Sequence, residues 1–153
     1  MTHPIINTLI KVHQLITPIT NNWILIGSSS LFLQGYPVKP NDIDILCPAA
    51  EAQQIEHLLK AYRFQPDANI SRDKFRSVFS KYVIDGVKVE VMGDLEVNTP
   101  SGWIKIWEQI KTPEYVVVDE HAFKVPSRAD QLTIYNFFCR EKDKAILQML
   151  KFG

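Results

Sequence analysis

Apolar residues recur at helical spacing over residues 4–16, which predicts an amphipathic helix at the start of the chain. Short apolar runs at residues 23–26 and 42–46 are typical of buried strands, and a short helix is expected between them over residues 28–34. A clearer helical pattern follows over residues 49–62. The first half of the chain is therefore expected to alternate helices with strands.

The middle of the chain carries the alternation of apolar and polar residues that is typical of strands. Two β-rich runs, at residues 75–84 and 87–92, are separated by Asp85-Gly86, a dipeptide that favours a tight hairpin turn. We expect a loop over residues 93–99. The pattern over residues 103–110 fits either a helix or a strand, and we favour a helix.

The last third of the chain predicts a second small hairpin and two helices. The hairpin strands are expected at residues 115–118 and 123–125, and Ser127 is suited to cap a helix that runs to about Cys139. A final helix is expected near residues 141–150. The whole pattern indicates an α+β fold, an α/β sandwich with a small mixed sheet, flanking helices and a helical C-terminal tail.

Length and composition limit the classes of protein that fit. The chain has 153 residues, enough for a single domain over residues 1–153, with a core at about residues 20–95 and a tail at about residues 100–153. Hydrophobic residues make up 46% of the chain and charged residues 22%, a balance typical of folded proteins. The formal net charge of zero gives no bulk attraction to nucleic acid, which excludes a dedicated coating protein.

Two features favour a cytoplasmic protein with no membrane partner. Cys47 and Cys139 lie far apart in apolar contexts, where buried thiols are more common than a disulfide, and thiols persist in a reducing compartment. No segment approaches the ~18 continuous apolar residues of a membrane span.

Three acidic residues stand in strand patterns where charge is otherwise unwelcome. Side chains at positions i and i+2 of a strand point the same way, so Asp42 and Asp44 share one face while Ile43 and Ile45 enter the core. Glu90 stands in the middle of a later strand. Like charges held together are costly unless a cation neutralises them, and carboxylate oxygens suit a divalent ion such as Mg²⁺. Asp42, Asp44 and Glu90 are therefore predicted to be metal ligands.

A small-residue turn precedes the acidic pair. Gly27 ends the apolar run, and Ser28 opens the predicted short helix. Backbone N–H groups at such a helix start form an anion site, to which Ser28 adds a hydroxyl. The sequence therefore predicts a phosphate site about one short helix away from the metal site.

These motifs together carry a family resemblance. The glycine–serine turn, the two spaced aspartates and the later apolar–acidic–apolar strand resemble the signature of the polymerase-β-like nucleotidyltransferase superfamily, over roughly residues 23–92. The chain is similar to small bacterial members related to abortive-infection toxins and to antibiotic-modifying enzymes. Residues 140–143, Arg-Glu-Lys-Asp, are similar to an Arg-x-Lys-Asp stretch of the toxin-related group.

The resemblance implies a Mg²⁺-dependent enzyme that moves a nucleoside monophosphate from a nucleoside triphosphate, ATP foremost, to a hydroxyl acceptor. Asp42, Asp44 and Glu90 would hold Mg²⁺ and act in catalysis, with Glu90 as a ligand of a second metal or as the base toward the acceptor. Gly27 and Ser28 would hold the triphosphate. The acceptor stays open among a small molecule, an RNA end and a protein side chain.

Basic residues are expected to meet the triphosphate or the acceptor. Arg76 and Lys88 are our candidates for nucleotide contact, and Arg72 and Lys74 are further ones.

Structural alternatives accompany each of these assignments. Glu90 could face solvent and pair with Lys81 or Lys88. Ser28 could serve only as a helix cap, and Arg140 with Lys142 could form a solvated helix end.

Two other functions also fit the sequence. One is a non-catalytic binding or regulatory module of the same fold, acting with a protein partner. The other is a metal-dependent hydrolase that uses water as the acceptor.

Overall fold

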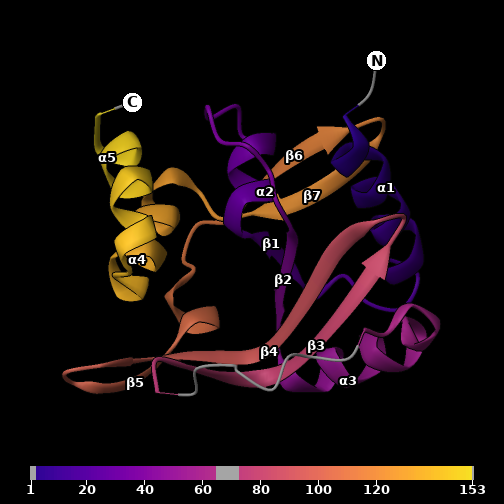
Figure 1. The fold of residues 1–153 in the computed structure, drawn as a ribbon, viewed down its shortest axis with the longest axis horizontal. Helices are drawn as coiled ribbons and strands as arrows, with labels where there is room; N and C mark the ends of the chain where they lie inside the picture. Colours follow the sequence, from indigo (N-terminus) through magenta and orange to yellow (C-terminus); the bar gives the residue numbers. More distant parts are fainter. Residues whose placement is uncertain (1–2, 65–72, 153) are drawn as a thin grey trace.

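A five-stranded mixed sheet forms the centre of the structure, a computed structural model that describes residues 3–64 and 73–152 (Figure 1). Four strands lie side by side in the order β1 (Ile24–Ile26), β2 (Ile43–Cys47), β4 (Val87–Thr99) and β3 (Phe75–Ile84). β5 (Gly102–Lys105) pairs with the far end of β4. β2 and β4 run parallel, and the other neighbours run antiparallel. This arrangement confirms the predicted α+β fold with a small mixed sheet.

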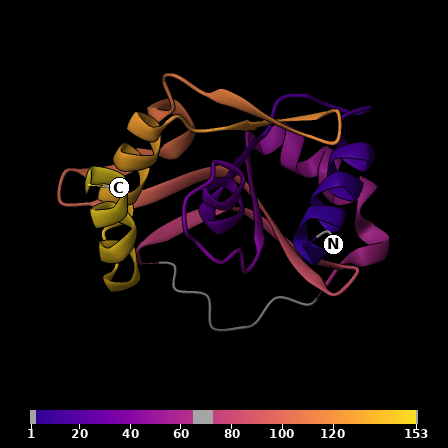
Figure 2. The same ribbon diagram turned by 90° about the horizontal axis from the view of Figure 1, so that it is seen from above.

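Helices cover both faces of the sheet. On one face, α1 (Pro4–Ile16) and α3 (Ala49–Leu58) pack against the apolar side chains of β2 and of the first half of β4. On the other face lie α2 (Gly27–Leu33) and the tail helices α4 (Arg128–Phe138) and α5 (Lys144–Phe152). Figure 2 shows α2 near the centre, with the tail helices and α1 on opposite sides of it.

Short elements complete the fold. The second hairpin consists of β6 (Glu114–Val118) and β7 (His121–Val125), as predicted. Three single turns of 3₁₀-helix follow α3, follow β5 and precede α5: Lys60–Tyr62, Ile106–Gln109 and Glu141–Asp143. No helix of the described residues is long and apolar enough to cross a membrane.

The predicted loop over residues 93–99 is wrong, because β4 continues through it to Thr99. Arg76 pairs with Glu96 and Val78 with Gly93, so β4 carries one more residue than β3 between these pairs. Asp94 adopts a positive φ of 50° there, which is the geometry of a β-bulge. The bulge exchanges the two faces of the strand, so Leu95 turns toward the tail helices. In the sequence, polar Asp94 resembles a residue at the end of a strand. In the structure it forms the bulge at which the strand changes face.

The favoured helix over residues 103–110 is also wrong in its first half. Gly102, at φ +110°, reverses the chain, and β5 then pairs back onto β4 with Trp103 opposite Asn98. A single 3₁₀ turn at residues 106–109 follows. Trp103 and Trp107, which are four apart, therefore do not share a helical face.

Other boundaries agree closely with the sequence analysis. α1 and β3 match their predicted ranges, and Ser127 caps α4 by accepting a hydrogen bond from the N–H of Asp130. α3 ends earlier than expected, at Leu58. Cys47 is buried as predicted, whereas Cys139 is exposed at the end of α4, where its φ is positive.

Candidate active site

A cleft of about 830 Å³ is lined by residues of α2, the sheet and the tail helices. Its floor is the face of β2, β3 and β4 that α1 and α3 leave free, and one side is formed by α4, α5 and the turn between them. The predicted residues that line the cleft are Gly27, Ser28, Asp42, Asp44, Arg76 and Glu90. The sheet and the tail thus enclose most of the predicted site.

The parallel pairing of β2 and β4 brings two of the predicted carboxylates together. Asp44 stands directly opposite Glu90 in this register. Asp42 precedes β2 by one residue and lines the same cleft. Glu90 forms no ion pair with Lys81 or Lys88, so the alternative of a solvent-facing, lysine-paired strand residue does not describe it.

The protonation equilibrium of Asp44 is strongly shifted by its surroundings. Burial, followed by the adjacent charges of Glu90 and Asp42, raises the pKa of Asp44 from 3.8 to about 8. Lys142, on the tail, opposes this shift. At neutral pH the Asp44 carboxyl therefore largely keeps its proton, which reduces the repulsion within the cluster.

The side chains are not preorganised around a single ion. Within residues 3–64 and 73–152, no three His, Cys, Asp or Glu side chains are arranged to hold a metal together. Adjacent carboxyls that share a proton need to lose it and reorient before they bind a cation. The set of oxygen donors nevertheless suits a hard divalent cation, because the raised pKa of Asp44 marks a place where positive charge would be stabilised.

Gly27 is required by two features of its surroundings. Its φ of +74° lies in the left-handed region, and a Cβ atom at this position would overlap Oδ2 of Asp44. This glycine was predicted to belong to a phosphate turn. Glycine at this position also makes room for the Asp44 carboxylate.

The three serines after Gly27 fasten this turn to its surroundings. The Ser28 hydroxyl accepts a hydrogen bond of 3.0 Å from the N–H of Asn41, and Ser29 donates to the carbonyl of Asp42. Ser30 donates to the carbonyl of Gly27 at 2.7 Å. Ser28 does not cap α2, whose N-cap is Ile26 with no side-chain hydrogen bond; with Ser29 it instead holds the segment that carries Asp42.

The predicted basic residues divide into two groups. Arg76 lines the cleft, but its guanidinium forms two hydrogen bonds of 3.1 Å to Glu96 and lies 4.1 Å from the ring centre of Trp103. Lys88 is exposed and does not line the cleft, and neither does Lys74. Arg72 lies outside the described residues.

The tail contributes residues to the cleft for which the alternative interpretation was a solvated helix end. Arg140, Lys142 and Asp143 all line the cleft, together with Tyr135 of α4. Asp143 is 2% exposed and accepts hydrogen bonds of 2.7 and 3.1 Å from the Arg140 side chain. The only sequence signal for these residues was the similarity of residues 140–143 to the Arg-x-Lys-Asp stretch, since charged residues after a helix are usually solvated.

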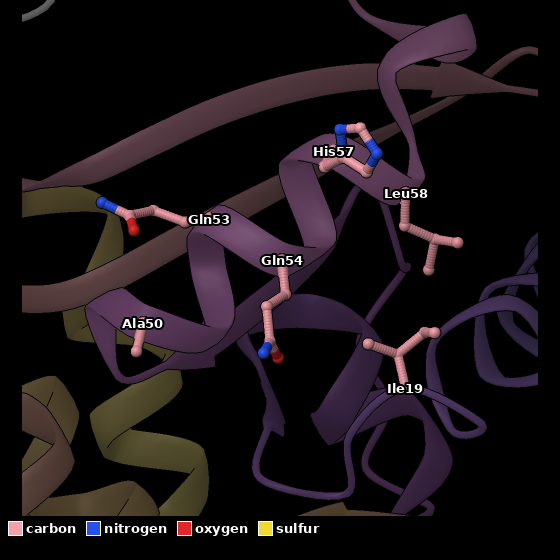
Figure 3. Close-up of a pocket in the computed structure, with 6 residues that line it drawn as sticks. All are labelled: Ile19, Ala50, Gln53, Gln54, His57 and Leu58. Atoms are coloured by element: carbon pink, nitrogen blue, oxygen red, sulfur yellow. The ribbon is translucent and has the colours of Figure 1, made fainter.

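A second hollow lies on the other side of the molecule and holds none of the predicted site residues. Ile19 and Leu58 face each other across it, and Ala50, Gln53, Gln54 and His57 of α3 complete it (Figure 3). None of the side chains that line it is a carboxylate.

The structure is similar to solved structures of nucleotidyltransferases. A Thermotoga maritima protein (TM1012) assigned to the nucleotidyltransferases is 29% identical, with a TM-score of 0.80 over 100% of this chain and 97% of that one. The lincosamide adenylyltransferase LnuA, solved with lincomycin, has a TM-score of 0.61 at 15% identity, over 95% and 96% of the two chains. ANT(2")-Ia, solved with adenylyl-2"-tobramycin, has a TM-score of 0.64 at 9% identity, over 99% and 91%. No curated protein matches the chain.

The fold is that of a nucleotidyltransferase. Residues 8–148 match the aminoglycoside-2''-adenylyltransferase family, and the chain belongs to that family. The resemblance inferred from the glycine–serine turn and the spaced aspartates is thereby confirmed.

Proposed function

We propose that this enzyme transfers a nucleoside monophosphate, AMP foremost, from a Mg²⁺-bound nucleoside triphosphate to the hydroxyl of a small molecule. The observation that carries the proposal is the register of β2 and β4. It places Asp44 against Glu90, beside Asp42, in a cleft that also presents Gly27 and Ser28. Transfer to a hydroxyl needs such a meeting of acidic groups and phosphate-binding groups.

The acidic residues, the glycine–serine turn and one lysine of the cleft each have a role in this proposal. Asp42 and Asp44 would hold the metal after Asp44 loses its proton, and bound Mg²⁺ would offset negative charge on the attacking and leaving oxygens. Gly27 and Ser28 would contact the triphosphate through their backbone N–H groups. Lys142 lies near enough to lower the pKa of Asp44 and is suited to meet the same phosphates.

Glu90 is the candidate base for the acceptor. The acceptor oxygen would attack the α-phosphorus as its proton passes to the Glu90 carboxylate, and the bond from that phosphorus to pyrophosphate would break. Arg76 is less suited to the triphosphate than we expected, because Glu96 already occupies its guanidinium. Lys88 has no place in the proposal.

The acceptor is proposed to be small because the tail closes the cleft. Tyr135, Phe138 and Ile146 line it from the tail helices, which leaves a volume of about 830 Å³ for both substrates. Two neighbours of the same fold were solved with lincomycin and with adenylylated tobramycin. These two hydroxyl compounds are therefore the first acceptors to test.

Nucleotide binding tests the first part of the proposal. Mg-ATP should raise the melting temperature by several degrees at a hundredfold excess over Kd, because a ligand that binds only the native state stabilises it by about 2.7 kcal/mol there. EDTA should abolish the shift, and Asp42→Asn should reduce it. No shift with either Mg-ATP or Mg-GTP would favour the non-catalytic binding module.

Product analysis tests the second part. Tobramycin and lincomycin are each added with α-labelled ATP, and the label should move from ATP to the acceptor as pyrophosphate is released. Free AMP formed at the same rate with and without an acceptor would favour the hydrolase instead.

A further inference from the structure

A buried chain of hydrogen bonds connects the tail to the glycine turn. Gln131, on α4, is fully buried, and its Nε2 donates to Oγ of Ser30 at 3.0 Å. Ser30, also fully buried, in turn donates to the carbonyl of Gly27 at 2.7 Å. Two hydrogen bonds thus join α4 to the residue that packs against Asp44.

The second N–H of the Gln131 amide extends this series of hydrogen bonds toward the small hairpin. Gln131 Nε2 also donates to Oε1 of Gln34 at 2.9 Å. The Gln34 amide then donates to the carbonyl of Pro126 at 2.6 Å and to the carboxylate of Glu114 at 2.9 Å. Gln131 therefore stands where α2, α4 and the end of the hairpin meet.

We propose that Gln131 is a positioning residue for the nucleotide site, which it acts on through Ser30 and the carbonyl of Gly27. The inference rests on the proposed function of the cleft. Gly27 has a positive φ, and its position decides how closely the turn approaches Asp44. Gln131 fixes the first turn of α2 by holding the Ser30 hydroxyl in the direction that reaches this carbonyl. The predicted cleft residues of α2 are thus set in place by a residue about a hundred positions later in the chain.

Stability alone does not explain why a glutamine is buried at position 131. Burial of an amide is costly unless all its polar atoms are paired, and Gln131 Oε1 has no hydrogen-bond partner among the described residues. Leu31, which follows Ser30 on α2, and Ile134, one turn after Gln131 on α4, both belong to the apolar core between these helices. A methionine of similar length would fill the same space without the unpaired oxygen, so the amide is best explained by what its N–H groups hold.

The test compares two variants that each lose one buried hydrogen-bonding group. Gln131→Met removes the hydrogen bonds to Ser30 and to Gln34. Tyr82→Phe, the matched control, removes the 2.8 Å hydrogen bond to buried Ser80 from Tyr82, which belongs to the core on the face of the sheet that α1 and α3 cover. Calorimetry gives Kd for Mg-ATP well below the melting temperature, and thermal unfolding gives stability.

Gln131→Met is expected to raise Kd about tenfold, the change that corresponds to one hydrogen bond of about 1.4 kcal/mol. Its melting temperature should fall no further than that of Tyr82→Phe, whose Kd should match the parent. Hydrogen exchange at the amides of Ser28 to Leu31 should become faster in Gln131→Met alone. An unchanged Kd in Gln131→Met, or an equal rise in both variants, overturns the proposal.

A double-mutant cycle identifies the route. Ser30→Ala should raise Kd as Gln131→Met does, and the two changes together should cost less than their sum, because each breaks the same chain of bonds. Additive effects would show that Gln131 does not act through Ser30. If the parent binds neither Mg-ATP nor Mg-GTP, the proposed function fails instead, and hydrogen exchange alone then decides whether Gln131 holds the turn.

Discussion

The two walls of the cleft are built in opposite ways. On the side of α2, a continuous segment of about 25 residues brings Gly27, Ser28, Asp42 and Asp44 together through a short helix and two neighbouring strands. On the tail side, Tyr135, Arg140, Lys142 and Asp143 approach the same space only because α4 packs across the sheet. Local geometry determines the first wall, and tertiary packing determines the second.

The difference has an energetic counterpart. The α2 side concentrates negative charge. Burial, together with the adjacent charges, raises the pKa of Asp44 to about 8. The tail side brings positive charge, of which Arg140 is neutralised by Asp143 while Lys142 acts on Asp44. We therefore expect substitutions on the α2 side to affect chemistry and stability together, and those on the tail side to adjust affinity.

The largest effect is expected for Asp44→Asn. Loss of this carboxylate should reduce transfer on the order of 10³-fold or more, as does removal of a group that stabilises charge in a transition state. The fold should remain intact, because an asparagine resembles the protonated carboxyl that Asp44 carries at neutral pH. Radiolabel transfer from ATP and denaturant unfolding measure the two quantities.

The pH dependence of stability gives an independent control. The folded pKa of about 8 lies above the ordinary value of 3.8, so the folded state binds more protons than the unfolded state between these values. The contribution is fully present below about pH 4 and is lost as the pH rises toward 8. Asp44→Asn should remove this decline, on the order of a few kcal/mol. An equally steep decline in the variant would contradict the assignment.

A smaller but still large effect is expected for Gly27→Val. The added side chain meets both a positive φ and the Asp44 carboxylate, so unfolding free energy should fall by about 2–4 kcal/mol and Mg-ATP binding should be largely lost. Denaturant unfolding and calorimetry measure these changes.

Gly35→Val is the matched control, because Gly35 has a φ of +90° but open space around it. It should cost only the backbone strain, about 1–2 kcal/mol, and leave nucleotide binding unchanged. Loss of binding in both variants would show that Asp44 is not the reason for glycine at position 27.

The residues of the α2 wall could be predicted from the sequence because their signals are local. Strand alternation placed Asp42 and Asp44 on one face, and Gly27 marked the turn. The residues of the tail wall could not be placed from the sequence, because nothing in residues 140–143 indicates which surface α4 packs against. The strand at residues 93–99 was also predicted wrongly, since an aspartate in a bulge resembles the end of a strand and only the pairing with β3 reveals the extra residue.

The smallest effect is expected for Lys142→Met, which keeps the aliphatic stem and removes the charge. Lys142 is exposed, and charge pairs near solvent contribute about 1 kcal/mol or less, so Kd for Mg-ATP should rise about three- to fivefold.

Lys144→Met is the control, because Lys144 is an exposed lysine two positions later that pairs with Glu141 and does not line the cleft. Its Kd should equal that of the parent.

High salt should reduce the difference between parent and Lys142→Met, since screening weakens an exposed charge. The pKa of Asp44 should rise further in Lys142→Met, because the one charge that lowers it is gone. If both lysine variants bind Mg-ATP equally well, Lys142 lines the cleft without contacting the nucleotide, and the tail wall serves the acceptor alone.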